Sequence, residues 1–344
     1  MSKQSPDMMT VATVGLDLAK HVFYVHAVDG ADQPVLAKML RRRDVVPFFA
    51  SLPRYLVGLE ACCSAHHWAR ELAALGHDVR LISPAYVKPY VKRQKNDAAD
   101  AAAICEAVTR PSMRFVKPRS IANQAVLMQH KVREMLVGQR TQALNGLRGH
   151  LAELGIIAAQ GARHARALAE ILCKGDASIP QEVRATLLPL AIQLDHLDVQ
   201  IAEADAAIVK LTKSDPVSNQ LMSIPGIGPV AASALSASVG VPSAFSGSRE
   251  FAAFLGLVPR QNSSGGKPRL DRISKMGNAY LRKLGAHAVL YHRKQHSDAL
   301  RCWADRLLES KPFKLVAVAL ANKLARLVFV IMSQNSRYRS VPAQ

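Results

Sequence analysis

The sequence predicts an α/β domain followed by a long, mostly helical remainder. From Thr10 to Ile82, short apolar runs rich in Val, Leu, Phe and Tyr alternate with turn signals, which is typical of strands and the helices between them. From Ile121 to Lys213 this alternation is absent, and apolar residues recur at three- and four-residue steps instead. With 344 residues, of which 49% are hydrophobic, the chain is long enough for two or three domains with their own cores.

The first region, residues 1–120, contains the predicted strands, at residues 11–16, 21–28, 34–40, 55–59 and 78–82. Short helices are expected at residues 45–51 and 64–75, the second closed by Gly76. Three strands in succession, followed by alternating helix and strand, predict a mixed sheet with helices packed on it.

The second region, residues 121–215, is predicted to be a helical spacer. Runs at residues 124–154 and 192–211 keep apolar residues on one side of a helix, which favours long helices and a coiled coil that could also dimerise. Residues 174–180 hold the break between them.

The third region, residues 216–344, is predicted to be mostly helical. Its segment Pro225-Gly226-Ile227-Gly228 lies between two expected helices and matches a helix-hairpin-helix. Glycines at 226 and 228 would let backbone N–H groups approach a DNA phosphate without reading bases. The simpler interpretation is a glycine-containing helix junction.

The charge of the chain indicates a partner rich in phosphates. The formal net charge is +19 and the pI about 10.0, which suits nucleic acid, although a merely soluble or ribosome-associated basic protein is the alternative. Five cysteines without CxxC spacing favour neither a disulfide framework nor a zinc knuckle, and they fit a reducing cytoplasm. No membrane segment is expected, because the start lacks a signal-peptide core and the apolar residues 315–332 include Asn322, Lys323 and Arg326.

Four acids stand where predicted elements begin or end. Asp17 follows the first apolar run, Glu60 follows residues 55–59, and Asp97 and Asp100 open a helix-like stretch. Asp17 alone has an ordinary explanation as a strand-end acid, and Asp97 and Asp100 have one in a helix cap formed by Asn96 or Asp97. Glu60 is less easily explained in this way, because it stands between buried-type and small apolar residues, and unpaired carboxylates resist burial. Carboxylates at adjacent strand ends repel one another unless a divalent cation lies between them, and two such ions about 3.5–4 Å apart can drive phosphodiester chemistry. Together the four acids predict one metal site.

A serine in a glycine turn, Ser264, is the second candidate site. A turn of this kind is usually just a turn, and the cations near it can form a solvated basic face, but they also suit a phosphate-bearing substrate: Lys267, Arg269, Arg272, Lys275 and Arg282. The segment is not an ATP-binding phosphate loop, because Pro268 stands where the magnesium-binding Ser or Thr would be, so no ATP requirement is expected.

Three downstream histidines are a weaker candidate site, in which they would be zinc ligands: His287, His292 and His296. Only the last two share one helix face, so phosphate or solvent contact is favoured over zinc.

With these motifs in this order, the chain resembles the DEDD-type insertion-sequence transposases, relatives of the Piv site-specific DNA invertase that include bridge-RNA-guided recombinases. The resemblance covers nearly the whole chain. It rests on the segments Gly15-Leu16-Asp17-Leu18-Ala19-Lys20, Gly58-Leu59-Glu60-Ala61, Lys95-Asn96-Asp97-Ala98-Ala99-Asp100-Ala101, Ile224-Pro225-Gly226-Ile227-Gly228, Phe254-Leu255-Gly256-Leu257-Val258-Pro259, Ser264-Gly265 and Ile273-Ser274-Lys275-Met276-Gly277-Asn278. One departure is Cys62-Cys63, where many relatives carry Thr or Ser and then Gly, and it concerns only local packing.

The resemblance implies an RNase H-like (RuvC-like) first domain, a coiled-coil middle and a third domain with a nucleophilic serine. By that analogy Asp17, Glu60, Asp97 and Asp100 hold Mg²⁺, with Mn²⁺ as a substitute. Ser264 attacks the scissile phosphate and forms a phosphoserine; it is preferred to Ser263 because it directly precedes the glycine. The implied partners are donor and target double-stranded DNA and a bridge RNA, in the bacterial cytoplasm at the nucleoid.

The resemblance also implies a homo-oligomer, either a dimer or a tetramer, in which acids and serine meet across two chains rather than within one. Two rival functions stay open. One is a metal-dependent junction-resolving nuclease, in which water attacks and Ser264 only contacts phosphate. The other is a non-catalytic DNA-binding protein whose acids are structural. A covalent protein–DNA adduct separates the recombinase from both rivals.

Overall fold

The computed structural model describes residues 10–92, 96–159, 161–283 and 299–339. His287, His292 and His296 lie outside the described residues. The chain divides into two compact units, Met1–Ser120 and Ile121–Gln344. The predicted division into three domains, with boundaries after residues 120 and 215, stays a prediction.

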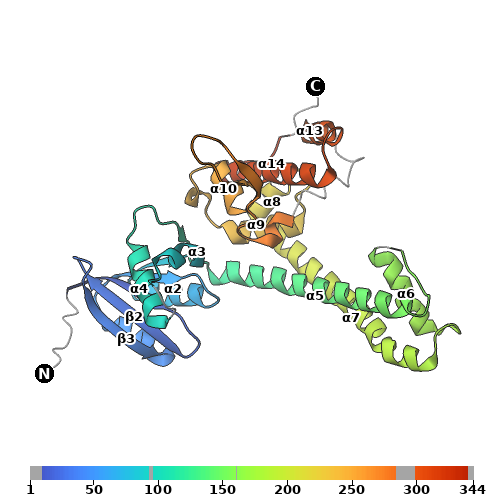
Figure 1. The fold of residues 1–344 in the computed structure, drawn as a ribbon, viewed down its shortest axis with the longest axis horizontal. Coiled ribbons are helices and arrows are strands. Elements are labelled where there is room, and N and C mark those ends of the chain that lie inside the picture. The colour runs from blue at the N-terminus through green and yellow to red at the C-terminus, as the bar shows by residue number, and fades with distance from the viewer. Residues whose placement is uncertain (1–9, 93–95, 160, 284–298, 340–344) are drawn as a thin grey trace. The chain divides into compact units, whose positions relative to one another are not determined.

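The described part of the first unit contains a six-stranded mixed sheet (Figure 1) in the order β3-β2-β1-β4-β5-β6. Strands β1, β4 and β5 are parallel, and the other neighbours pair antiparallel. The strands are β1 (Val11–Asp17), β2 (Val22–Asp29), β3 (Pro34–Arg41), β4 (Leu56–Glu60), β5 (Asp78–Ile82) and β6 (Phe115–Val116). The predicted mixed sheet and its first five strands are confirmed, and the two-residue β6 is an addition.

Helix α2 packs on this sheet through apolar side chains. Trp68 and Leu72 of α2 pack in one buried cluster with Leu16 of β1 and Leu59 of β4. The expected helices at residues 45–51 and 64–75 are confirmed as α1 and α2. The helices of this unit are α1 (Val45–Ala50), α2 (Ala65–Ala74), α3 (Pro84–Val87) and α4 (Asp97–Val108), with short 3₁₀ turns η2 (Arg42–Asp44) and η3 (Lys88–Tyr90).

Helix α4 lies directly against the backbone of β1 because residue 15 is a glycine. A Cβ atom at Gly15 would lie 2.2 Å from the carbonyl oxygen of Ala101 and 2.8 Å from Cβ of Cys105. No side chain fits in that space without moving the helix away from the strand. This close packing brings the first turn of α4 to the end of β1, where Asp17 lies.

The second unit begins with a long antiparallel helix pair. The pair consists of α5 (Ile121–Ala152) and α7 (Gln181–Ser214), and α6 (Ala162–Lys174) lies between them in the chain. Arg133 of α5 pairs with Asp205 of α7, and Arg140, later in α5, pairs with Asp198, earlier in α7, at 3.1 Å. The predicted long helices and the break at residues 174–180 are confirmed. The separate helix α6 was not predicted, and the supercoil of a true coiled coil stays a prediction.

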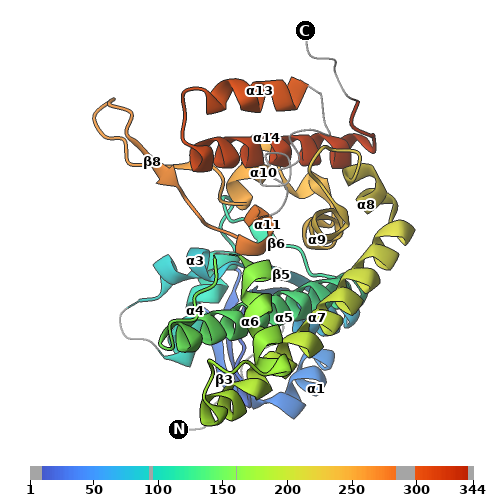
Figure 2. The ribbon, with the colours of Figure 1, turned by 90° about the vertical axis from the view of Figure 1, so that its right-hand side faces the viewer.

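In the rest of the second unit, the apolar helix α14 runs between α13 and α10, as Figure 2 shows. Val316, Leu320, Leu324 and Val328 of α14 are each at most 2% exposed. Helix α14 is long and apolar enough to cross a membrane by length and composition, but these buried side chains explain its apolarity as that of a core helix. The other elements are α8 (Pro216–Leu221), α9 (Pro229–Val239), η4 (Pro242–Ala244), α10 (Ser248–Phe254), β7 (Pro259–Gln261), β8 (Leu270–Ile273), α11 (Ala279–Lys283), α13 (Ala299–Leu308) and α14 (Phe313–Gln334).

A buried histidine joins α5 to the helices that follow α7. His130 is 2% exposed, and its two ring nitrogens lie 3.1 Å from the hydroxyls of Ser233 in α9 and Tyr280 in α11. Burial, followed by the charge of Arg133, lowers the pKa of His130 to about 4, so the imidazole is neutral at neutral pH. A neutral ring with both nitrogens hydrogen-bonded is well suited to a buried junction between helices.

Candidate metal centre and serine hairpin

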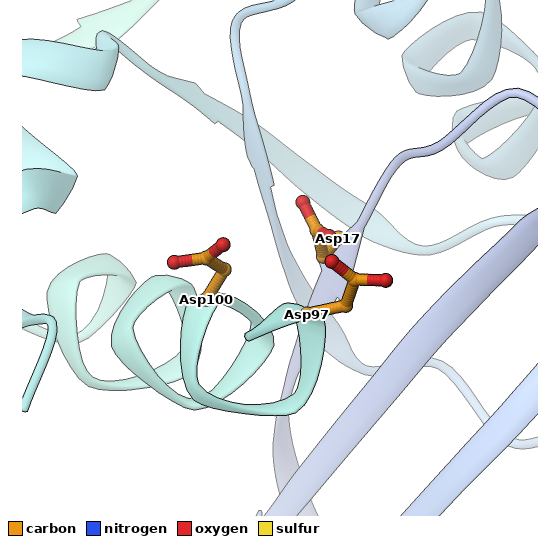
Figure 3. Close-up of side chains that lie close together, drawn as sticks. All are labelled: Asp17, Asp97 and Asp100. Atoms are coloured by element: carbon orange, nitrogen blue, oxygen red, sulfur yellow. The ribbon is translucent and has the colours of Figure 1, made fainter. Parts of the chain in front are cut away.

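Three of the four predicted acids come together at one edge of the sheet (Figure 3). Asp17 ends β1, whereas Asp97 and Asp100 lie in the first turn of α4. One carboxylate oxygen from each of the three lies within 4.8 Å of the others. Residues 80 positions apart in the chain are therefore brought close together, and their role as one metal site stays a prediction.

The start of α4 is fixed by a side-chain cap. The side chain of Asn96 accepts a hydrogen bond from the backbone N–H of Ala99 at 2.8 Å, so Asn96 rather than Asp97 is the N-cap. The side chain of Asp97 is therefore not used as the cap. The helix dipole stabilises the negative charge of both acids in the first turn. The cap thus sets which turn of the chain presents its acids to Asp17.

Glu60 lies near this cluster without joining it. It ends β4, which pairs in parallel with β1, so the expectation that Asp17 and Glu60 end neighbouring strands is confirmed. Its carboxylate is not among the oxygens that lie within 4.8 Å of one another in the described part of the chain. Its negative charge nevertheless contributes to the raised pKa of Asp17. Its role as a fourth ligand stays a prediction.

The electrostatics of Asp17 reflect its burial close to other acids. Its pKa rises to about 6, chiefly because the carboxyl is half-buried, and then because of the negative charges of Asp100, Asp97 and Glu60. Among the residues that the structure describes, no lysine or arginine forms an ion pair with Asp17, Asp97 or Asp100. Bringing these carboxylates together therefore costs free energy that a bound cation would offset.

The donor set fits a hard divalent cation. Three carboxylates offer only oxygen ligands, the kind that Mg²⁺, Mn²⁺ and Ca²⁺ prefer. Oxygens bound to one Mg²⁺ lie about 3–4 Å apart, so the observed spacing of up to 4.8 Å needs only small side-chain rotations.

Ser264 occupies the tip of a β-hairpin. Strands β7 and β8 pair antiparallel, and Ser264 forms an isolated bridge with Lys267 across the turn. The N–H of Lys267 donates to the carbonyl oxygen of Ser264 at 3.1 Å. Between them Gly265 and Gly266 have φ of 56° and 74°, the left-handed conformation that a tight hairpin turn of this kind requires. A hairpin tip differs from the strand–loop–helix setting of an ATP-binding phosphate loop.

The two neighbouring serines have different environments. The Ser263 hydroxyl accepts hydrogen bonds from the Arg269 N–H and from the Gln261 side-chain amide, each at 3.0 Å, and so ties the two sides of the hairpin together. Within the described part of the chain, no hydrogen bond engages the hydroxyl of Ser264, which is exposed. Ser263 thus maintains the hairpin, and Ser264 presents a hydroxyl that is accessible for reaction.

The cations near Ser264 also fall into two groups. Exposed residues of the hairpin and the segment after it are Lys267, Arg269, Arg272 and Lys275. Arg282, by contrast, donates hydrogen bonds to the carbonyl oxygens of Leu255, Met276 and Gly277 at 2.9–3.3 Å. Its guanidinium holds two loops together, so a phosphate contact by Arg282 stays a prediction beside this structural role.

The glycine turn between α8 and α9 has the predicted helices on both sides. Gly226 has φ of 84°, and Gly228 is the N-cap residue of α9, whose first turn begins with Pro229. A Cβ atom added at Gly228 would have no neighbouring atom of the described residues within 4 Å, so that position is open. Contact with DNA through Gly226 and Gly228 stays a prediction.

The hairpin itself was missed by the sequence reasoning, which expected only a serine turn among helices. The signal was available, because Gly-Gly between two short extended segments is typical of a tight hairpin. The locking role of Ser263 carried no comparable signal, since its partner Arg269 is recognised only once the strands pair.

An acid cluster at the edge of a mixed sheet, in a strongly basic chain, is the arrangement of an enzyme that acts on nucleic acid with a divalent metal ion. Two family models match the chain: a DEDD transposase model of IS110 elements over residues 14–156, and the model "Transposase IS116/IS110/IS902 family" over residues 218–301.

Relatives match over almost the full chain. A "Probable family 20 transposase" of Pseudomonas aeruginosa is 47% identical over 96% of this chain and 99% of its own length. The transposase for insertion sequence element IS1328 of Yersinia enterocolitica is 38% identical over 96% of this chain and 99% of its own length. The transposase for insertion sequence element IS1111A of Coxiella burnetii is 38% identical over 98% of this chain and 94% of its own length. The chain belongs to the IS110/IS116/IS902 family of insertion-sequence transposases, enzymes of DNA recombination.

Proposed function

We propose that this transposase cuts and rejoins the DNA of its insertion sequence through a covalent phosphoserine on Ser264. The observation that carries the proposal is a contrast within the exposed hairpin: the Ser263 hydroxyl accepts hydrogen bonds from Gln261 and Arg269, whereas no hydrogen bond in the described part of the chain engages the adjacent Ser264 hydroxyl. A nucleophile must approach the phosphorus in line with the leaving oxygen, and an unengaged hydroxyl at an exposed turn is suited to that approach.

The chemistry balances without an external energy source. The Ser264 Oγ–phosphorus bond forms as the bond from phosphorus to one deoxyribose oxygen breaks, and the serine proton is lost while the leaving oxygen gains one. A hydroxyl from another strand end then attacks the phosphoserine, which restores the serine and joins the strands. Because the ester conserves the bond energy, no ATP is required.

The acids supply the second half of the site. We assign Asp17, Asp97 and Asp100 as ligands of Mg²⁺, which Mn²⁺ would replace, and Glu60 as the fourth. A bound divalent cation stabilises negative charge on the phosphate and makes a weakly nucleophilic serine sufficient. The acids and Ser264 must act on the same phosphate, supplied either by one chain or by two chains of an oligomer.

Donor and target DNA are held mainly through phosphate contacts in this proposal. The net charge of +19 and the exposed cations Lys267, Arg269, Arg272 and Lys275 support it. Gly226 and Gly228 would add backbone N–H contacts. Such contacts position DNA without reading its sequence. The choice of sequence is therefore assigned to a bridge RNA, on the resemblance to RNA-guided recombinases, with action at the bacterial nucleoid in the cytoplasm.

A homodimer, or a tetramer built from it, is supported by one side of α5. Four apolar residues at steps of seven, four and three residues share a helix face and are each more than half exposed: Ile121, Met128, Val132 and Met135. This stripe has the spacing of a coiled-coil seam, and an exposed seam is stabilised by burial against a second copy.

The test compares two adjacent serines. Ser264→Ala should retain DNA binding but lose strand cleavage and any denaturation-resistant protein–DNA adduct in the presence of Mg²⁺. Ser263→Ala, a matched change one residue away, should keep the adduct at reduced yield, because it loosens the hairpin without removing the nucleophile. Mass spectrometry of the trapped adduct would identify the modified residue.

The outcomes distinguish the rival functions. A nucleotide on Ser263 would overturn the choice of serine. Mg²⁺-dependent cleavage without any adduct would favour the junction-resolving nuclease, in which water attacks. DNA binding without cleavage by the folded wild-type protein, whatever metal is added, would favour a non-catalytic DNA-binding protein.

A further inference from the structure

A small hollow lies in the first unit, apart from the acid cluster. It has a volume of about 270 Å³ and is lined by Tyr86, Pro89, Tyr90, Ser112, Met113 and Arg114. This is just below the range of sites for drug-sized ligands, which begin at about 300 Å³. A small open hollow lined by two tyrosines, a proline, a methionine and an arginine is suited to a single planar ring.

The hollow is built on a fixed base. Tyr90 and Met113 are partly buried and pack against the apolar cluster that contains Ile82, Val87 and Ile104. Val87, between the two tyrosines, is 1% exposed and anchors α3 to this cluster. Tyr86 is 46% exposed. The ring of Tyr90 thus forms one wall of the hollow and is supported by the core. The exposed ring of Tyr86 is available to cover a bound group.

The sheet topology places this hollow at the same edge as the acids. Helix α3 begins directly after β5, and β5 ends beside Glu60, since Ile82 pairs with Glu60 in the parallel ladder. Strand β6 is antiparallel to β5, so Met113 and Arg114, which precede it, lie at that edge too. Neighbouring strands are about 4.8 Å apart, which puts the end of β5 roughly 10 Å from the end of β1. That span corresponds to a few nucleotides of a DNA strand.

We infer that this hollow, the Tyr86–Tyr90 pocket, stacks an unpaired base of the DNA strand a few nucleotides from the phosphate that is cut. The inference rests on the proposed function, because it places the pocket beside a DNA-cleaving site. Aromatic side chains stack on any base, whereas a base paired inside a duplex has no free face to offer. Lys88, exposed between the tyrosines, and Arg114 provide the positive charge that follows the backbone. The pocket therefore holds a strand that is opened at the cut.

The test measures stacking separately from chemistry. The full-length Asp17→Asn protein, in EDTA, would be titrated into a short single-stranded DNA that carries 2-aminopurine, whose fluorescence falls when the base stacks. Tyr86→Ala in this background should weaken binding about 5- to 150-fold and remove the quenching, as expected for a loss of about 1–3 kcal/mol of stacking per base. Tyr86→Phe keeps the ring and should bind within about twofold of the parent.

Two further arms complete the design. Fully paired DNA of the same sequence should bind Tyr86→Ala and the parent equally. Lys88→Gln should reduce the salt dependence of binding and leave the quenching intact.

Specific results would overturn the inference. Equal single-strand binding and quenching by the Ala and Phe variants would show that no base occupies the pocket. An equal loss for paired and unpaired DNA would indicate a general structural effect. Quenching and Tyr86 dependence with RNA but not with DNA would assign the pocket to an RNA strand instead. These results do not depend on cleavage, so a failure of the phosphoserine mechanism, seen as a missing adduct in the wild type, would remain distinguishable.

Discussion

Replacing Asp17 by asparagine should make the metal-free protein more stable at neutral pH, even though it removes a residue of the proposed metal site. The carboxyl of Asp17 is half-buried and faces the negative charges of Asp97, Asp100 and Glu60. Ionised Asp17 therefore disfavours the folded state when no cation is bound. Asparagine has nearly the same shape and carries no charge, so it removes this repulsion while keeping the packing at the end of β1.

The magnitude follows from the pKa. Raising the pKa of Asp17 from 3.8 to about 6 corresponds to about 3 kcal/mol of destabilisation at high pH, at about 1.4 kcal/mol for each tenfold change in the acidity constant. Because the carboxyl is partly exposed and screened by solvent, we expect about 1–2 kcal/mol.

The sign and the pH window follow from proton uptake. Between pH 3.8 and about 6 the folded protein holds a proton on Asp17 that the unfolded chain has lost, so this contribution to stability falls as the pH rises. The gain in the free energy of unfolding of Asp17→Asn over the parent should reach about one third of its maximum at pH 4.5 and its full value above pH 7.

Tryptophan fluorescence provides the assay. The chain has two tryptophans, and Trp303→Phe leaves Trp68, which is 4% exposed in the core of the first unit, as the reporter. Urea unfolding would be followed in EDTA at pH 4.5, 6.0 and 7.5, and again with Mg²⁺. Mg²⁺ should stabilise the parent by mass action and the Asp17→Asn variant little.

A matched control is available on the same unit. Asp44 is exposed in η2 and pairs with Arg43 at 3.6 Å, so Asp44→Asn should change the free energy of unfolding by less than about 0.5 kcal/mol. The reasoning would be refuted if metal-free Asp17→Asn were no more stable than the parent at pH 7.5, or if Mg²⁺ stabilised both proteins equally.

Three further predictions concern binding and assembly. Affinity for DNA should fall by orders of magnitude between roughly 50 and 200 mM salt, as measured by fluorescence anisotropy, and a flat salt dependence would contradict phosphate-dominated binding. Purified protein should retain a discrete RNA from its own element, detectable by sequencing, whereas full site specificity in RNA-free protein would contradict guidance. Val132→Lys should lower the mass measured by light scattering, while Gln129→Lys, which adds the same charge outside the α5 stripe, should not; an unchanged mass for Val132→Lys would exclude that stripe as the interface.

Much of the first unit could be predicted because its signals are local. Apolar runs bounded by turns mark β1 to β5, and a short polar residue before a helical stretch marks the cap at Asn96. Since parallel strands end at a common edge, Asp17 and Glu60 could be placed together from strand order alone. The family motifs depend likewise on residue identity and spacing, which a sequence contains in full.

Only the tertiary structure shows the features that depend on strand pairing and on contacts between residues far apart in the chain. β6 has two residues and is defined by backbone hydrogen bonds to β5, which leave no periodic pattern. The closeness of Asp17 to α4 depends on Gly15 meeting Ala101, a contact between remote segments. Whether Glu60 reaches the other acids is a matter of side-chain position. The division of roles between Ser263 and Ser264 likewise depends on which hydroxyl the paired strands of the hairpin engage, because adjacent residues of the same type are distinguished only by the neighbours that folding gives them.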